Sequence, residues 1–375
     1  MTIGVRLIGI VLLGLSLAAA PASAAPKHKS GAAQSRSVAV APSGTQQKHP
    51  EVKSGNPSSS KLDNDEEQRP RPLVTAQRTP MTLPKTTLVL GTATPGGGFP
   101  FYGDALAAAV NATDPSFRIE TRNTKGSAEN ITLLEEGKLD IALVAGEPAY
   151  EAFSGIGRPV TSLKIITAIY SNPGMFAVRG DSPYPSLQSL IGKPVVWGTR
   201  DSGLTLLARY VLDGLGLDRE RDFQALYLER AGDGPAMVLE GRAAALWGGG
   251  TGWPGFTAVT QAGGRLIGLS PADAARICKK HIFLKPLTVP AGTYPNQNEV
   301  ITSVGSWSYV LARPGLDDDI AYRLVRAIHR SYNALVQRVA QARETTPQNT
   351  VTAAPRLVHI HPGVQKYFRE IGVIR

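Results

Sequence analysis

Apolar and polar positions from residue 86 onward predict a strand, a glycine-rich loop and a helix, in that order. Leu88–Leu90 is a short apolar run, as expected of a strand buried in a parallel sheet. Pro95–Gly98 interrupts regular structure, and from Tyr102 onward apolar residues recur at helical spacing. The free N–H groups at the start of such a helix can bind an anion. A tight turn that only joins strand to helix is an equally good interpretation.

The same unit recurs further along the chain. A strand at Pro194–Trp197 is followed by a polar loop at Gly198–Gly203 and by an amphipathic helix that ends at glycines. Between the two units, Ser127 is predicted to cap a helix that ends at Gly137. Further strands are predicted at Arg118–Arg122, Asp140–Val144, Lys164–Tyr170, Met175–Val178, Phe223–Leu228 and Ala243–Trp247.

The C-terminal quarter has a different pattern. Val300–Ala312 is predicted to be one long extended segment, and the acidic trio Asp317–Asp319 to start a long helix that reaches about Arg343. Thr345–Ala354 is predicted to lack regular structure. His359 and His361 alternate in a predicted extended segment, so their rings could share a side and hold a metal. Two ligands without a third make a weak site, and a surface pair is the favoured interpretation.

This alternation of strands and helices predicts an α/β protein with two lobes and a mostly parallel sheet in each. We assign residues 86–175 to the first part of lobe I, 176–305 to lobe II, and 306–375 to a return to lobe I with C-terminal helices. Ligands of open α/β sheets bind outside the carboxyl ends of the strands, so both loops should face one cleft. Closure is predicted to be a hinge motion through Ser171–Val178 and Val300–Ser308.

The N-terminal region predicts export. Arg6 precedes the apolar run Leu7–Ala20, and Ala22-Ser23-Ala24 has the small residues of a cleavage site, so residues 1–24 are predicted to be a signal peptide cleaved after Ala24. The protein should therefore be periplasmic. Residues 25–85 are polar and poor in aromatic residues, which predicts a disordered tether or a dispensable leader.

Composition narrows the classes of partner. The 375 residues carry a net charge of +10, but the basic residues are scattered, so nucleic acid is not an expected partner. A positive surface favours acidic small molecules. Cys278 is the only cysteine, which excludes an internal disulfide and a cysteine-based metal site, and we predict no cofactor. No H-E-x-x-H, G-x-S-x-G or C-x-x-C motif occurs, so a hydrolase-like enzyme is only a minor alternative.

Several separated motifs resemble those of one known family over roughly Leu88–Gly372. They are Gly91-Thr92 with Pro95-Gly96-Gly97, Gly126-Ser127-Ala128-Glu129-Asn130, the run Gly137–Val144, Asp201-Ser202-Gly203, the run Pro290–Pro295, and His361-Pro362-Gly363. In their order and spacing these motifs resemble the extracytoplasmic solute receptors of the TAXI family, which serve tripartite TRAP-type transporters.

The resemblance implies a periplasmic-binding-protein (type II) clamshell that closes on a small carboxylate-bearing solute and delivers it to a membrane permease. A sensor that uses the same clamshell without transport is the alternative. The sequence departs from the family at Gly98–Phe101, where Thr-Tyr-Tyr-Pro is usual, and at Asp201–Leu204, where Gly-Ser-Gly-Thr is usual. Asp201 would repel a carboxylate unless Arg200 or Lys125 compensates.

Candidate ligand-binding residues come from both lobes, partly by this resemblance. Ser127 and Ser202 can instead be simple helix caps, and Arg200 is more often solvated than bound to a ligand. Trp253 and Trp247 flank a glycine loop, with core packing favoured for Trp247. The predicted set is Thr92, Gly97, Gly98, Ser127 and Asn130 from lobe I, and Arg200, Ser202, Gly203, Thr205, Trp253 and Tyr294 from lobe II, where Tyr294 serves equally well as hinge or lid packing.

Overall fold

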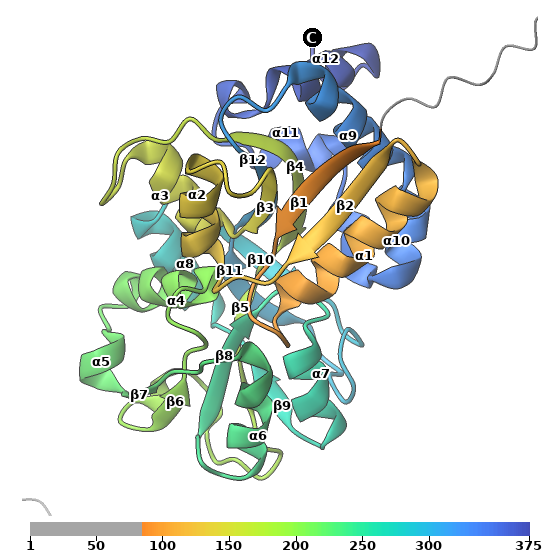
Figure 1. Ribbon diagram of the computed structural model, residues 1–375. Coiled ribbons are helices and arrows are strands. Elements are labelled where there is room, and N and C mark those ends of the chain that lie inside the picture. Colours follow the sequence, from red (N-terminus) through yellow and green to blue (C-terminus); the bar gives the residue numbers. More distant parts are fainter. Residues whose placement is uncertain (1–84) are drawn as a thin grey trace, which may run out of the picture. The chain divides into compact units, whose positions relative to one another are not determined.

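The computed structural model describes residues 85–375 and contains two five-stranded sheets, each with helices around it (Figure 1). We call these sheets and their helices lobe I and lobe II. The predicted signal peptide and all but the last residue of the predicted tether lie outside the described residues. Within the described residues, no helix is both long and apolar enough to span a membrane.

The sheet of lobe I has the strand order β2-β1-β3-β12-β4. Its central strands β1 and β3 are parallel to each other, and β2 is parallel to β1. β12 runs antiparallel to both β3 and β4, so the sheet is mixed and not mostly parallel. The strands are β1 (Thr86–Gly91), β2 (Phe117–Arg122), β3 (Ile141–Val144), β4 (Lys164–Ser171) and β12 (Trp307–Ala312).

The sheet of lobe II repeats this arrangement with the order β7-β6-β8-β5-β9. β6 is parallel to β7 and β8, whereas β5 is antiparallel to β8 and β9. One strand of each mixed sheet is therefore reversed next to a parallel pair. The strands are β5 (Gly174–Val178), β6 (Pro194–Val196), β7 (Gln224–Leu226), β8 (Ala245–Gly249) and β9 (Arg265–Ile267).

Helices cover both faces of each sheet, which explains why the central strands are apolar without alternation. In lobe I, Leu143 and Val310 pack on one face with α1, while Ala142 and Leu311 pack on the other. The helices of lobe I are α1 (Gly98–Thr113), α2 (Ser127–Glu135), α3 (Gly146–Ser154), α9 (Asp318–Arg330), α10 (Tyr332–Arg338), α11 (Pro347–Ala353) and α12 (Pro362–Glu370). Those of lobe II are α4 (Gly203–Gly214), α5 (Arg219–Asp222), α6 (Gly234–Leu239), α7 (Pro254–Gln261) and α8 (Pro271–Lys280).

The C-terminal segments differ from the prediction in three ways. The long helix stops at Arg330, and Ser331 separates it from the short helix α10, which in turn ends where the backbone becomes extended at Val339. Thr345–Ala354, predicted to be loose, contains α11. The extended segment from Val300 to Ala312 is two strands, of which β11 (Ile301–Gly305) pairs with β10 (Lys285–Val289) outside both large sheets.

The chain crosses between the lobes at two segments that hydrogen-bond to each other. Asn172 lies between β4 and β5, and Ser306 lies between β11 and β12. The Asn172 N–H donates to the carbonyl of Ser306 at 2.9 Å, and its side-chain amide donates to the Ser308 hydroxyl. Both crossings fall inside the segments predicted to form the hinge.

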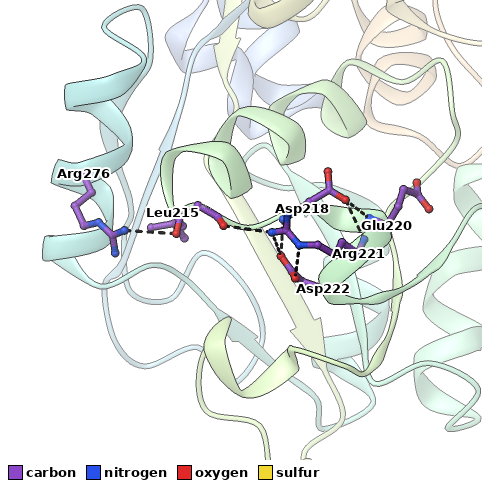
Figure 2. A network of polar contacts seen from close by, with 7 residues as sticks. Leu215, Asp218, Glu220, Arg221, Asp222 and Arg276 are labelled. Atoms are coloured by element: carbon purple, nitrogen blue, oxygen red, sulfur yellow. Dashed lines mark hydrogen bonds and ion pairs between the residues drawn. The ribbon is translucent and has the colours of Figure 1, made fainter.

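A surface network of polar contacts fixes the short helix α5 in lobe II (Figure 2). The Asp218 carboxylate accepts hydrogen bonds from the N–H groups of Glu220 and Arg221, both at 2.9 Å. Arg221 in turn donates to both carboxylate oxygens of Asp222, at 2.9 and 2.7 Å, which lowers the pKa of Asp222. These charges satisfy one another, so the network is structural.

Candidate functional site

A partly open cavity of about 70 Å³ lies between the lobes, where α1 and α4 begin. A water molecule needs roughly 10–15 Å³ by the same measure, so the cavity has room for a small solute. Lobe I contributes Gly97 and Gly98, and lobe II contributes Ser202 and Gly203. The two strand–loop–helix units that the sequence indicates therefore do face one cavity.

The first residue of each helix, Gly98 of α1 and Gly203 of α4, lines this cavity, and its N–H group has no acceptor among the described residues. α1 begins after Gly97, which makes no side-chain cap, and Pro100 in the first turn has no N–H group to donate. α4 begins after Ser202, whose hydroxyl accepts a hydrogen bond from the Leu204 N–H at 3.2 Å. Ser202 is thus a helix cap and a cavity residue at once. The positive ends of both helices favour an anion between them.

Tyr170, at the end of β4, is a cavity residue that the sequence did not indicate. Its side chain is 97% buried, since only 3% of the residue is exposed, and it lines the cavity. The phenol oxygen lies 3.3 Å from the point that a Cβ on Gly98 would occupy. Among the described residues it has no hydrogen-bond partner. Burial raises the pKa of Tyr170, so the hydroxyl stays protonated and can donate to a bound solute.

Lys125 is the only charged side chain among the lining residues of the cavity. It is exposed, and within residues 85–375 no carboxylate lies within ion-pair distance of its ammonium group. Asp201, expected to oppose an anion, does not line this cavity. The charge at the cavity is therefore positive, which agrees with the helix ends.

The remaining wall is largely apolar and aromatic. Trp253 lies buried at the cavity, and its indole Nε1 donates to the carbonyl of Gly96 in the opposite lobe at 3.2 Å. Trp247 also lines the cavity, while it packs in the core of lobe II and donates to the carbonyl of Leu204 at 2.8 Å. The other apolar members are Ala93, Phe99, Ala145, Trp197, Leu204, Leu228, Ala231 and Leu246.

Three predicted ligand-binding residues instead hold the loops in place and do not line the cavity. The Asn130 amide donates to the carbonyls of Thr92 and Leu143, at 2.7 and 2.8 Å. The Thr92 hydroxyl donates to the carbonyl of Arg122, and that of Thr205 to the carbonyl of Thr199 at 2.7 Å. The two hydroxyls and the Asn130 amide N–H groups are thus already paired with backbone, while the buried Asn130 Oδ1 has no partner among the described residues.

Ser127 is neither a helix cap nor a cavity residue. Gly126 is the residue before α2, with a φ of 128° that favours glycine, and it makes no side-chain cap. The buried Ser127 hydroxyl accepts a hydrogen bond from the Ala145 N–H at 3.0 Å. It therefore joins the starts of α2 and α3, which is a contact between distant parts of the chain.

Arg200 and Tyr294 also lie outside the cavity lining. The Arg200 guanidinium stacks on the ring of Tyr227, 3.8 Å from its centroid. The Tyr294 hydroxyl accepts from the N–H of Gly252 at 2.8 Å and donates to the carbonyl of Gly250 at 2.8 Å. Tyr294 thus fixes the loop that carries Trp253 and acts on the cavity only through that loop.

The two histidines do not form the expected surface pair. His361 is buried before α12, where its Nδ1 accepts from the Gly363 N–H at 3.3 Å, and burial lowers its pKa. The His359 ring stacks on Phe153 with centroids 4.4 Å apart. Across residues 85–375, no three His, Cys, Asp or Glu side chains gather closely enough to hold a metal.

The lobes touch each other on more than one side of the cavity. The N–H groups of Ala231 and Gly232 in lobe II donate to the Thr94 hydroxyl and the Pro95 carbonyl in lobe I, both at 3.3 Å. On another side, Glu151 of α3 accepts hydrogen bonds from Arg209 and Tyr210 of α4. These contacts are those of a closed conformation.

Comparisons with known proteins bear on the family and the fold of the chain. The model of the NMT1-like family matches residues 90–372. The structure of MatC from Rhodopseudomonas palustris with bound malate is 13% identical over 77% of this chain and 99% of that chain, with a TM-score of 0.51. The aliphatic sulphonate binding protein SsuA from Escherichia coli is 18% identical over 76% of this chain and 84% of that chain, with a TM-score of 0.45. The described chain has the type II periplasmic-binding-protein fold, as predicted.

Proposed function

The chain belongs to the NMT1-like family, and we propose that it is an exported solute-binding protein without catalytic activity. It captures a small carboxylate-bearing solute between its lobes and delivers it to a membrane permease of the TRAP type. The motifs that resemble the TAXI family support this assignment, and so does the malate bound by MatC, which has the same fold.

The observation that carries the proposal is the cavity itself. The first residue of a helix from each lobe, Gly98 and Gly203, lines it, and Lys125 is the only charged side chain among its lining residues. Because the contributing groups come from both lobes, a bound anion is held only when the lobes are closed. A solute would therefore stabilise the closed state by its differential affinity. A permease can recognise that closed state.

A thermal-shift screen tests the proposal. The purified protein is heated with organic acids, amino acids, sugars and phosphate esters in turn. A solute at a hundred times its dissociation constant adds about 2.7 kcal/mol of stability, and we expect a rise in melting temperature confined to carboxylates. A response to neutral or cationic compounds alone would contradict the carboxylate, and silence with every compound would contradict solute binding.

A further inference from the structure

The cavity between the lobes carries one cation and no anion. Lys125 is its only charged lining side chain, and neither aspartate nor glutamate lines it. A solute with two carboxylates would bury its second negative charge without a cationic partner. A solute with an α-amino group would bury an ammonium without a carboxylate. Burial of an unpaired charge is costly, so both kinds of solute are disfavoured.

The apolar part of the cavity lining is suited to an apolar body. Leu228, Leu246 and Trp247 are buried residues of lobe II that line the cavity together with Leu204 and Trp253. The Nε1 atoms of both tryptophans already donate to backbone carbonyls. The rings of Trp247 and Trp253 therefore offer apolar surface to the solute. The buried Nε1 of Trp197, which also lines the cavity, has no partner among the described residues and is the one indole donor left on this wall.

Two hydroxyls of the cavity indicate independently that the protein binds one polar group of the solute. Tyr170 lines the cavity and is only 3% exposed. Its hydroxyl has no hydrogen-bond partner among the described residues. The Thr199 side-chain hydroxyl lines the cavity too and has no partner within residues 85–375. Each hydroxyl therefore has a hydrogen bond to donate that no protein group accepts. A bound carboxylate would satisfy either one by accepting its hydrogen bond.

We propose that the cavity binds a monocarboxylate with a compact apolar body and rejects dicarboxylates and α-amino acids. The carboxylate lies between the starts of α1 and α4 within reach of Tyr170 and Lys125, and the apolar body contacts Trp253 and the leucines. This inference rests on the proposed function, because it concerns the solute of the same site. It restricts the carboxylate-bearing solutes that the family resemblance implies to monocarboxylates.

Calorimetric titration of the purified protein with four matched compounds tests the inference. Isovalerate has one carboxylate and a branched apolar body. Valine adds an α-amino group to that body, succinate replaces the apolar end by a second carboxylate, and 3-methylbutan-1-ol lacks the carboxylate. We expect isovalerate to bind, and each of the other three to bind at least about 100-fold more weakly.

The outcomes separate this inference from the proposed function. Tighter binding of succinate or valine than of isovalerate would overturn the monocarboxylate and leave carboxylate capture intact. Tighter binding of the alcohol, which has no carboxylate, would overturn both. If none of these compounds binds but the thermal-shift screen finds another carboxylate, the compact apolar body proposed for the solute is wrong. The proposed function then stands.

Two variants test the groups that hold the carboxylate. Tyr170→Phe and Lys125→Met should each weaken isovalerate binding about 10-fold, since each removes one hydrogen bond or ion pair. The matched controls Tyr184→Phe and Lys138→Met lie outside the cavity and should leave the affinity unchanged. Unchanged affinity in both cavity variants, with melting temperatures like those of the controls, would overturn the assigned position of the carboxylate.

Discussion

Glu147 is a fully buried carboxyl group at the start of α3, beside the crossing between the lobes. Its Oε1 accepts a hydrogen bond from the Ser306 hydroxyl at 2.6 Å, while Oε2 is buried without a partner among the described residues. Burial, opposed by the Ser306 hydrogen bond, raises the pKa of Glu147 from 4.5 to about 7. The folded protein therefore holds a proton there that the unfolded chain has lost.

This pKa predicts a stability profile for Glu147→Gln. Between pH 4.5 and about 7 the folded wild type binds more protons than the unfolded chain, so its stability falls as the pH rises through this window. The loss is about 3 kcal/mol at most. Glutamine does not titrate, so the free energy of unfolding of the variant should not show this fall. Between pH 4.5 and above pH 7, the stability of the variant relative to the wild type should therefore rise by that amount. Urea denaturation from pH 4.5 to 8 measures it.

The control is Glu136→Gln, which changes an exposed carboxylate, 45% accessible, in the same lobe. Its free energy of unfolding should follow that of the wild type across the same pH range. Parallel profiles for the wild type and Glu147→Gln would contradict the raised pKa. The sequence could not indicate this residue, because nothing local to Glu147 shows that Ser306 lies above it.

The roles of other residues also depend on how far along the chain their partners lie. The cap at Ser202 could be predicted, because a serine before an apolar helix bonds within its own turn. The role of Ser127 could not, since its partner Ala145 belongs to another helix start. Tyr170 looked like an ordinary strand residue, and only the approach of Gly98 makes it part of the cavity.

At the scale of elements, most strands were predictable, but β9, β10 and several helices were not. Buried strands such as β3 are continuous apolar runs, so the pattern alone indicates them. α11 has weak periodicity and is positioned by distant contacts. Its Thr350 hydroxyl accepts from the Ala168 N–H at 2.9 Å, and the Tyr309 hydroxyl donates to the Ala353 carbonyl at 2.6 Å. Tertiary packing thus decides the structure of this segment.

The start of α11 depends on one local cap, which predicts the effect of Thr346→Ala. The Thr346 hydroxyl accepts a hydrogen bond from the Asn349 N–H at 3.1 Å, and Pro347 follows it in the first turn. Loss of this cap should lower the free energy of unfolding by about 1 kcal/mol, measured by urea denaturation. Thr352→Ala, on the exposed side of the same helix, should cost much less. Equal losses of free energy of unfolding in the two variants would show that the Thr346 cap makes no specific contribution to stability.

At the scale of the whole described molecule, a glycine at the start of α4 permits the closed contact between the lobes, and a second glycine nearby serves for comparison. A Cβ on Gly203 at the start of α4 would overlap the Ala145 side chain and lie 2.9 Å from the Ser127 hydroxyl. A Cβ on Gly232 would lie 3.4 Å from Gly96, an ordinary van der Waals distance. The sequence indicates two lobes and a cleft, but not these distances, because they arise only when the lobes close.

Gly203→Ala should therefore prevent full closure, whereas Gly232→Ala should permit it. The readout is hydrogen exchange of the Ala231 amide, which in the closed form donates to the Thr94 hydroxyl of the opposite lobe. We expect this amide to exchange faster in Gly203→Ala than in the wild type, and at the wild-type rate in Gly232→Ala. Protection of the strand β3 should be the same in all three proteins, which separates opening of the lobes from unfolding. Wild-type protection of Ala231 in Gly203→Ala would mean that the start of α4 adjusts without moving the lobes apart, and the cavity would then depend on side chains more than on closure.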